Sequence, residues 1–238
     1  MPAELVLIGG ASVLINYGFR NMTTDIDALI QAASAMKEAI NHVGDRYGLP
    51  NGWLNADFTS TDSYSVKLTQ FSVYYKTYAN IVTIRTVAAE YLIAMKLRSG
   101  RQYKSDLSDV LGILAEHEKR GTRITMDQIR KAVGDLYGAW ETLPESSRAF
   151  IENVMEDGRF VELYEQTVSG ERETKELLIQ FEKDYPGVTR ESNVDKIAEN
   201  LQKKTDRASI LARLREKKAQ TEQIEAAKLI EKRDDRER

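Results

Sequence analysis

Two aspartates inside an apolar run, in 24-TDIDALI-30, have the clearest potential for chemistry. The alternating pattern predicts a strand on which Asp25, Asp27 and Leu29 lie on one side and the isoleucines and the alanine on the other. Side chains two residues apart on a strand point the same way, so the two carboxylates repel each other unless a cation lies between them. Mg²⁺ prefers one or two carboxylates together with phosphate oxygens, which makes it the expected ion. The alternative is a strand at a sheet edge with both aspartates hydrated.

A glycine turn precedes the aspartates by about a dozen residues. The run 5-LVLI-8 predicts a short buried strand that ends at Gly9 and Gly10, and 11-ASVLINYGF-19 predicts a short helix. Glycine lets a ligand approach the backbone closely, and a helix N-terminus presents free N–H groups to an anion. Ser12 adds a hydroxyl near the helix start. An ordinary helix cap would look the same, but an anion site and a cation site joined by a short helix suit a metal–polyphosphate complex.

One lysine is unusual because of its neighbours. In 87-VAAEYLIAMKLRSG-100, the pattern predicts a helix that is apolar nearly all round and is closed by Gly100. Lys96 lies in its most apolar part, so its ammonium group must either reach past its neighbours to solvent or meet an anion in the interior.

Several common chemistries lack their residues. The chain has no cysteine, which excludes disulfides and thiolate chemistry, and it has neither GxGxxG nor GxxxxGK[ST]. His42 and His117 are the two histidines, and both lie in polar helical segments where a solvated surface histidine explains them.

The elements around these residues predict an α+β fold, with a small mixed sheet and helices followed by an all-helical C-terminal half. Ser105 is the expected cap of the helix that begins at Asp106. Strands are expected at 64–75 and 80–87, and helices at 34–48, 87–100, 106–121, 125–141, 144–157 and 159–184. We expect a core over 1–86, a helical domain completing the site over 87–202, and a charged helical or disordered tail over 203–238.

Composition limits the class of protein. The chain has 238 residues, 42% of them hydrophobic, and a net charge of -3, which argues against a generally basic nucleic-acid binder. The tail 203–238 has 12 Lys and Arg against 8 Asp and Glu, so a helical arm that contacts a partner or RNA is an alternative to disorder. No signal peptide and no membrane-spanning run is expected, which predicts a soluble, cytoplasmic protein without a membrane partner.

The pattern Gly-Gly-x-Ser, about a dozen residues, then Asp-x-Asp resembles the polymerase-β-type nucleotidyltransferase superfamily. The resemblance implies that Gly9, Gly10 and Ser12 hold the triphosphate of a nucleoside triphosphate (NTP). It also implies that Asp25 and Asp27 bind two metal ions, with Mg²⁺ expected.

The second half of the match, 92-LIAMKLRSGRQYKSDLSDVLGIL-114, resembles AbiEii-like (abortive-infection) nucleotidyltransferases, which include toxins of toxin–antitoxin pairs. The resemblance implies that Lys96 contacts the triphosphate and that Asp106 orients it. Asp109, Arg98 and Arg101 are weaker candidates, the arginines for phosphate or RNA. The implied function is transfer of a nucleoside monophosphate from an NTP to an RNA 3′ end or a protein hydroxyl, by the toxin of a pair with a cognate antitoxin.

One departure from that family leaves alternatives open. Its polymerase-like members place a third carboxylate on a later strand, but neither 64–75 nor 80–87 contains an acidic residue. Asp57 and Asp62, both in loop-like sequence, are the candidates for that group. A catalytically inactive nucleotide-binding or scaffold protein on the same fold, or an unrelated α+β interaction protein, are the alternatives.

Overall fold

The computed structural model describes residues 3–20, 22–23, 25–31, 35–101, 105–190 and 192–204. Contacts divide the chain into two compact units, Met1–Glu171 and Arg172–Arg238, which are described separately. Nearly all of the predicted tail 203–238 lies outside the described residues. The predicted division at residues 86 and 202 rests on sequence texture and stays a prediction.

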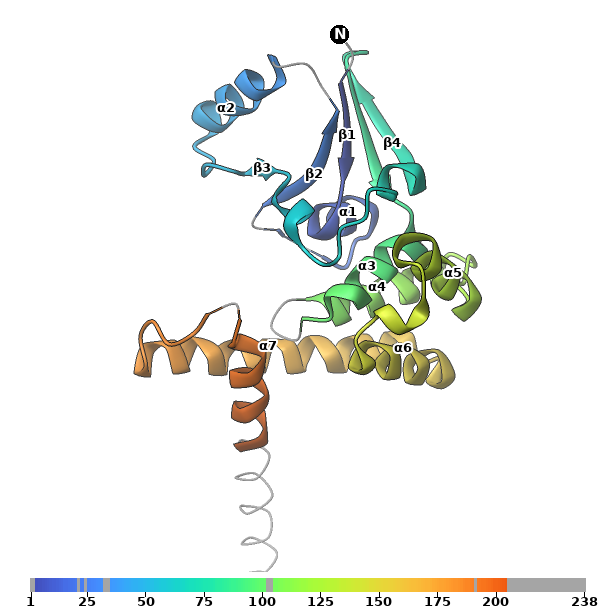
Figure 1. Cartoon of the computed structure of the whole chain (residues 1–238), viewed down its shortest axis with the longest axis vertical. Helices are drawn as coiled ribbons and strands as arrows, with labels where there is room; N and C mark the ends of the chain where they lie inside the picture. The colour runs from blue at the N-terminus through green and yellow to red at the C-terminus, as the bar shows by residue number, and fades with distance from the viewer. Residues whose placement is uncertain are drawn as a thin grey trace, which may run out of the picture. The chain divides into compact units, whose positions relative to one another are not determined.

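The first unit contains a five-stranded mixed sheet with the order β3-β2-β1-β5-β4. Strands β1 and β5 are parallel, β2 and β3 are parallel, and the pairs β1–β2 and β4–β5 are antiparallel. Figure 1 shows α1 at the end of the sheet where β1 stops and β2 starts. The strands are β1 (Ala3–Leu7), β2 (Ile26–Gln31), β3 (Leu54–Asn55), β4 (Ser72–Tyr78) and β5 (Val82–Val87).

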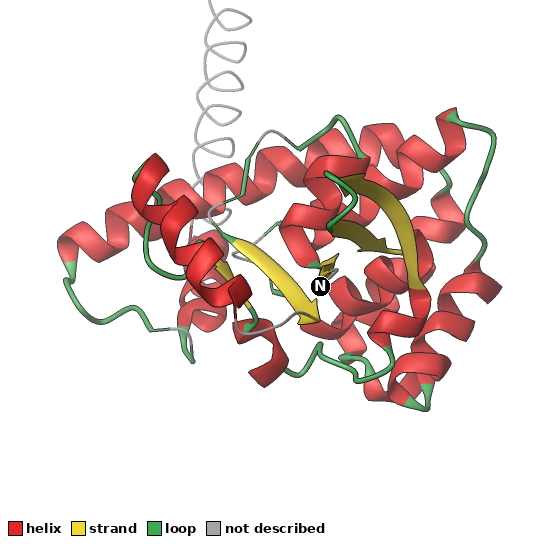
Figure 2. Cartoon of the chain, turned by 90° about the horizontal axis from the view of Figure 1, so that it is seen from above, coloured by secondary structure: helices red, strands yellow, loops and turns green. Residues whose placement is uncertain are grey.

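The expected α+β class with a small mixed sheet is confirmed, and Figure 2 shows the strands in yellow among the more numerous red helices. Most helices begin and end within two residues of the predicted boundaries, but the helix expected at 125–141 ends at Tyr137 and the one expected at 11–19 spans Gly9–Asn16. They are α1 (Gly9–Asn16), α2 (Ala35–Tyr47), α3 (Ala89–Ser99), α4 (Asp106–Lys119), α5 (Met126–Tyr137), α6 (Glu145–Asp157) and α7 (Phe160–Asp184). Short 3-10 turns lie at Asp57–Ser60, Leu68–Phe71 and Trp140–Thr142.

The strand expected at 64–75 is wrong over its first eight residues, because strand β4 begins only at Ser72. The preceding segment is held by α5 instead of by the sheet. The Ser65 hydroxyl donates to the carbonyl of Leu136 at 3.0 Å, and Lys67 Nζ donates to the carbonyl of Asp135 at 2.7 Å. These hydrogen bonds hold the segment against residues that are distant in sequence, which its high β propensity could not indicate.

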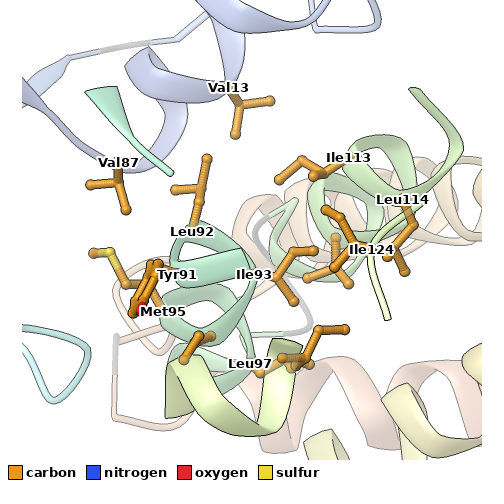
Figure 3. Packing of buried hydrophobic residues seen from close by; sticks show 14 of the residues in the cluster. Val13, Val87, Tyr91, Leu92, Ile93, Met95, Leu97, Ile113, Leu114 and Ile124 are labelled. Atoms are coloured by element: carbon orange, nitrogen blue, oxygen red, sulfur yellow. The ribbon is translucent and has the colours of Figure 1, made fainter. Parts of the chain in front are cut away.

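The main core lies between the sheet and helices α3, α4 and α5. On this side of the sheet, Val6 and Val87 are buried against α3. Figure 3 shows Leu92 of α3 below Val13 of α1, with Ile93 facing the side chains of α4. The other side of the sheet carries a smaller cluster built on Leu7, Ala11 and Ala28. Helix α3 therefore ties the sheet to the helices and is buried around most of its circumference, as predicted.

Two local expectations need correction. Helix α1 begins at Gly9 itself, so the glycines form its first turn instead of a separate turn before residue 11. Ser105 occupies the N-cap position of α4, but its side chain makes no capping hydrogen bond. The N-terminus of α4 is capped from α7, where Glu171 accepts hydrogen bonds from the Ser108 N–H at 3.1 Å and from its hydroxyl at 2.6 Å.

The second unit continues α7 and adds a helical stretch at 194–204. Val194 and Ala198 are its buried apolar residues among those described. Its turn is closed by Glu182, whose carboxylate accepts from the N–H groups of Gly187 at 2.7 Å and Thr189 at 3.3 Å. Across the described parts of both units, every helix is too short or too polar to cross a membrane.

Candidate functional site

The start of α1 lies directly against the second aspartate of the pair. Gly9 has a φ of +55°, a conformation that favours glycine, and a Cβ placed on it would lie 3.4 Å from Asp27 Oδ2. The backbone makes the same connection, because the N–H of Ile8 donates to the carbonyl of Asp27 at 2.9 Å. The structure therefore places Asp27 beside the glycines at the start of α1.

The two aspartates are not equivalent. Asp27 lies within β2 and is half-buried, whereas Asp25 is exposed and precedes the strand, which starts at Ile26. The predicted strand thus carries one of the two carboxylates, and the other lies at its entrance. Binding of Mg²⁺ by the two carboxylates stays a prediction.

Asp57 and Asp62, the two candidates for the third carboxylate, lie in different surroundings. In the parallel pairing of β2 with β3, Asp27 lies opposite Asn55, and the Asn55 amide oxygen accepts from the N–H of Asp57 at 2.7 Å. Asp57 is exposed and thus follows the strand that neighbours Asp27. By contrast, the carbonyl of Asp62 accepts from Arg98 at 3.3 Å. Within the described ranges, no group of three His, Cys, Asp or Glu side chains is assembled for a metal.

Arg20 covers the other glycine. A Cβ on Gly10 would lie 2.8 Å from Thr23 Oγ1 and 3.0 Å from Arg20 Nη2, so a side chain there would require these groups to shift. Arg20 Nε donates to the carbonyl of Met22 at 3.1 Å, and Thr23 Oγ1 donates to the carbonyl of Asp25 at 3.1 Å. Arg20 and Thr23 therefore lie over the start of α1, with the guanidinium group beside it.

A buried network of charges continues from Arg20 into the helices. Lys96 Nζ of α3 lies 2.8 Å from Asp106 Oδ1 and 2.8 Å from Asp109 Oδ2, both on α4. The same Asp109 oxygen binds Arg20 Nη1, and Asp106 Oδ2 binds Arg101 Nε at 3.0 Å. We call these five residues the Lys96 network. Lys96 is 8% exposed, Asp106 1% and Asp109 2%, so its centre is shielded from water.

The electrostatics of the network favour the charged forms. Burial alone would raise the pKa of Asp106, but the ammonium of Lys96 and the guanidinium of Arg101 outweigh it and lower that pKa to about 2. Burial alone would lower the pKa of Lys96, but the two aspartates raise it. Nearby, burial and then the charges of both aspartates raise the pKa of Glu171. Lys96 is therefore a fixed cation, as expected, but the anions it meets are aspartates of its own chain.

Two further candidates, Ser12 and Arg98, and the two histidines are placed less directly. Ser12 is the fourth residue of α1, its side chain is fully buried, and its Oγ has no hydrogen-bond partner among the described residues. Its contact with phosphate stays a prediction. Arg98 lies over the ring of Tyr137, with Cζ 5.8 Å from the ring centroid. His117 is half-buried, with Nε2 3.1 Å from the Tyr17 hydroxyl, and its contacts are structural. His42 is exposed on α2.

Sequence reasoning missed Arg20. The run 17-YGFRNMTTD-25 contains the single basic residue between the glycine turn and the aspartates, and that was the available signal. Its place is fixed by Phe19, whose carbonyl accepts from the Tyr164 hydroxyl at 3.3 Å and whose ring stacks with Tyr17 at 5.7 Å.

The arrangement thus joins a helix start, a carboxylate pair and a guanidinium group in one place. Residues 1–117 match the family described as nucleotidyltransferase of unknown function (DUF6036). The matched part is slightly less than half of the chain and contains the glycine turn, the aspartate pair and the whole Lys96 network. Comparison with curated proteins and with solved structures found no match. The finding supports a nucleotidyltransferase family for the N-terminal part and leaves the AbiEii-like resemblance as an expectation.

Proposed function

We propose that the protein is a metal-dependent nucleotidyltransferase that moves a nucleoside monophosphate from an NTP to a hydroxyl group. The observation that carries the proposal is the position of the Asp27 carboxylate beside Gly9 at the start of α1, where a Cβ on Gly9 would lie 3.4 Å from Oδ2, within the segment that matches the family. This arrangement joins an anion site to a cation site, which is what a metal–triphosphate substrate requires.

Each part of the site has a task in this reaction. The half-exposed backbone of Gly9 and Gly10 binds the β- and γ-phosphates at the helix start, and Asp25 and Asp27 hold Mg²⁺. A bound divalent cation supplies charge neutralisation on the phosphates and lowers the pKa of the acceptor hydroxyl. The protein contributes mainly position and electrostatics, as is usual for phosphoryl transfer.

The reaction balances with one bond made and one broken. The acceptor oxygen bonds to the α-phosphorus, the bond from that phosphorus to the bridging oxygen breaks, and pyrophosphate leaves. The hydroxyl proton must pass to a base. Asp57 is our candidate because it is exposed and follows the strand residue opposite Asp27.

The acceptor and the biological role rest on the resemblance alone. We propose an RNA 3′ end as the acceptor, with a protein hydroxyl as the alternative, and a toxin role with a cognate antitoxin in the cytoplasm. The test of the role is expression in a bacterial host, where we expect a growth defect that Asp25→Ala relieves. Expression without a defect would leave an enzyme that is not a toxin.

A nucleotide-binding protein without turnover is the second candidate. It is favoured by one observation, namely that the described residues assemble no group of three metal-binding side chains.

The deciding experiment incubates purified protein with Mg²⁺, each labelled NTP in turn, and total RNA or protein. We expect label transfer that Asp27→Asn abolishes and that Asp45→Asn, an exposed aspartate on α2, leaves unchanged. NTP binding without transfer would support the second candidate. If Asp25→Asn and Asp27→Asn both bind NTP as wild type does, no nucleotide site exists at this aspartate pair.

A further inference from the structure

The buried cation expected to contact phosphate is already enclosed by carboxylates. Lys96 Nζ has two of them at 2.8 Å, and the side chain is 10% exposed. An ammonium group has three donors, and two of its directions are taken by Asp106 and Asp109. A phosphate reaching Lys96 would have to displace a buried carboxylate and leave it without its partner, which is costly.

Asp109 connects this lysine to a more accessible cation. Its Oδ2 atom binds Lys96 Nζ and Arg20 Nη1 together, so the three groups form one ion cluster. The Arg20 side chain is 22% exposed, against 3% for that of Asp109. Lys96 fixes Asp109, and Asp109 in turn fixes one edge of the guanidinium group.

The other edge of the guanidinium group lies at the helix start. Arg20 Nη2 is 3.0 Å from the Cβ position of Gly10, and Nε is held by the carbonyl of Met22. A guanidinium group presents its donors in a planar fork that matches phosphate oxygens, whereas an ammonium group acts as a point charge. Because Nη1 is held by Asp109 and Nε by the carbonyl of Met22, the planar group has a fixed orientation, and its Nη2 donors lie beside the first turn of α1, where backbone N–H groups favour an anion.

We propose that Arg20 binds the phosphates of the substrate and that Lys96 and Asp109 are positioning residues that act through it. This inference rests on the proposed function, because it assigns the phosphate contact within the same site. It reverses the order expected from sequence, in which Lys96 touches the triphosphate itself.

The experiment measures the affinity of the full chain for ATP and for inorganic tripolyphosphate by calorimetry, with Mg²⁺ present. We expect Arg20→Met to weaken both by about 10-fold or more, since hydrogen bonds to charged groups are strong. Arg130→Met, an exposed arginine on α5, is the matched control and should change neither. Asp109→Asn should weaken both by about 3-fold to 10-fold, through loss of the guanidinium anchor.

A double-substitution cycle separates positioning from contact. If Lys96 and Asp109 act only through Arg20, then Lys96→Met and Asp109→Asn add no further loss of affinity once Arg20→Met is present. Additive losses in the Arg20→Met background would overturn the proposal, as would an Arg20→Met chain that binds tripolyphosphate like wild type. Asp109→Asn and Arg20→Met carry the test should Lys96→Met fail to fold.

Failure of the proposed function gives a different result. In that case the wild-type chain binds neither ATP nor tripolyphosphate, and the inference falls with it. If the inference alone fails, the wild-type chain still binds both ligands. Arg20→Met then binds like wild type, and Lys96→Met loses affinity instead.

Discussion

Gly112 in α4 offers a sharp test of how the Arg20 segment is held. A Cβ on Gly112 would lie 2.5 Å from Cζ, 2.6 Å from Cε2 and 2.8 Å from Cδ2 of Phe19. The ring would have to retreat by almost one ångström to reach an ordinary contact distance. It has little room, because it stacks with Tyr17 at 5.7 Å and meets Tyr164 edge-on at 5.4 Å.

Two opposing free energies decide the effect of Gly112→Ala on unfolding. Alanine gains about 1 kcal/mol over glycine in a helix interior. Crowding an added methyl group into a packed site costs about 1–3 kcal/mol. Gly134 in α5 is the matched control, because a Cβ there has no neighbour within 4 Å and should give the gain alone. We therefore expect Gly112→Ala to be less stable than Gly134→Ala by about 1–3 kcal/mol.

Urea unfolding followed by far-UV circular dichroism measures this difference, and each kcal/mol corresponds to about 2–4 °C in Tm for a chain of this size. Because Phe19 precedes Arg20, we also expect Gly112→Ala to weaken tripolyphosphate binding, while Gly134→Ala leaves it unchanged. A Phe19→Leu change should restore part of the lost stability of Gly112→Ala by making room for the methyl group. Equal stabilisation by both alanines would refute the reasoning, since it would show that the Phe19 ring moves away at no cost.

Three further outcomes are expected. Lys96→Met should lower the free energy of unfolding by about 3–5 kcal/mol in urea titration, because it leaves two buried carboxylates short of a partner. The Asp106 pKa is depressed to about 2, so its stabilisation is complete above its unfolded pKa near 4 and is lost as pH falls through about 2. The urea midpoint should therefore fall more steeply between pH 4 and 2 in wild type than in Asp106→Asn. Gly100→Ala should cost about 1–3 kcal/mol by thermal unfolding, since Gly100 has a φ of +55° and its Cβ position lies 2.6 Å from Ser147 Oγ.

Short-range pattern was sufficient for the parts of the site that are close in sequence. The strand–glycine–helix unit and the place of Asp27 in β2 follow from alternation and from glycine. The burial of Lys96 follows from an apolar helix surface. These predictions work because strand and helix periodicities are local properties of the chain. Asp106, by contrast, became a candidate only through the family resemblance.

Long-range pairing was beyond that reasoning. Arg20 and Asp109 are 89 residues apart, and a lone arginine in polar sequence gives no sign of its partner. From the sequence, Gly112 is only a residue that lowers helix stability. The structure shows that the ring of Phe19 packs against it. The strand predicted before β4 is wrong for the same reason, since the Ser65 hydroxyl donates a hydrogen bond to a helix about seventy residues later. In each case a tertiary contact determined the structure where local propensity alone could not.

The position of the network explains why helices α3 and α4 belong with the sheet in any account of this site. Buried ion pairs contribute little net stability, because desolvation offsets their attraction, so stability alone is a poor reason for placing a lysine between two aspartates. Such a pair does fix geometry, and the geometry fixed here is that of a guanidinium group at the start of α1. The segment that matches the family ends at residue 117, eight residues beyond Asp109, and so includes Asp109, which binds the guanidinium group, and Lys96, which binds Asp109. A chain cut after β5 at residue 87 would keep the glycines and both aspartates and lose the anchor of Arg20.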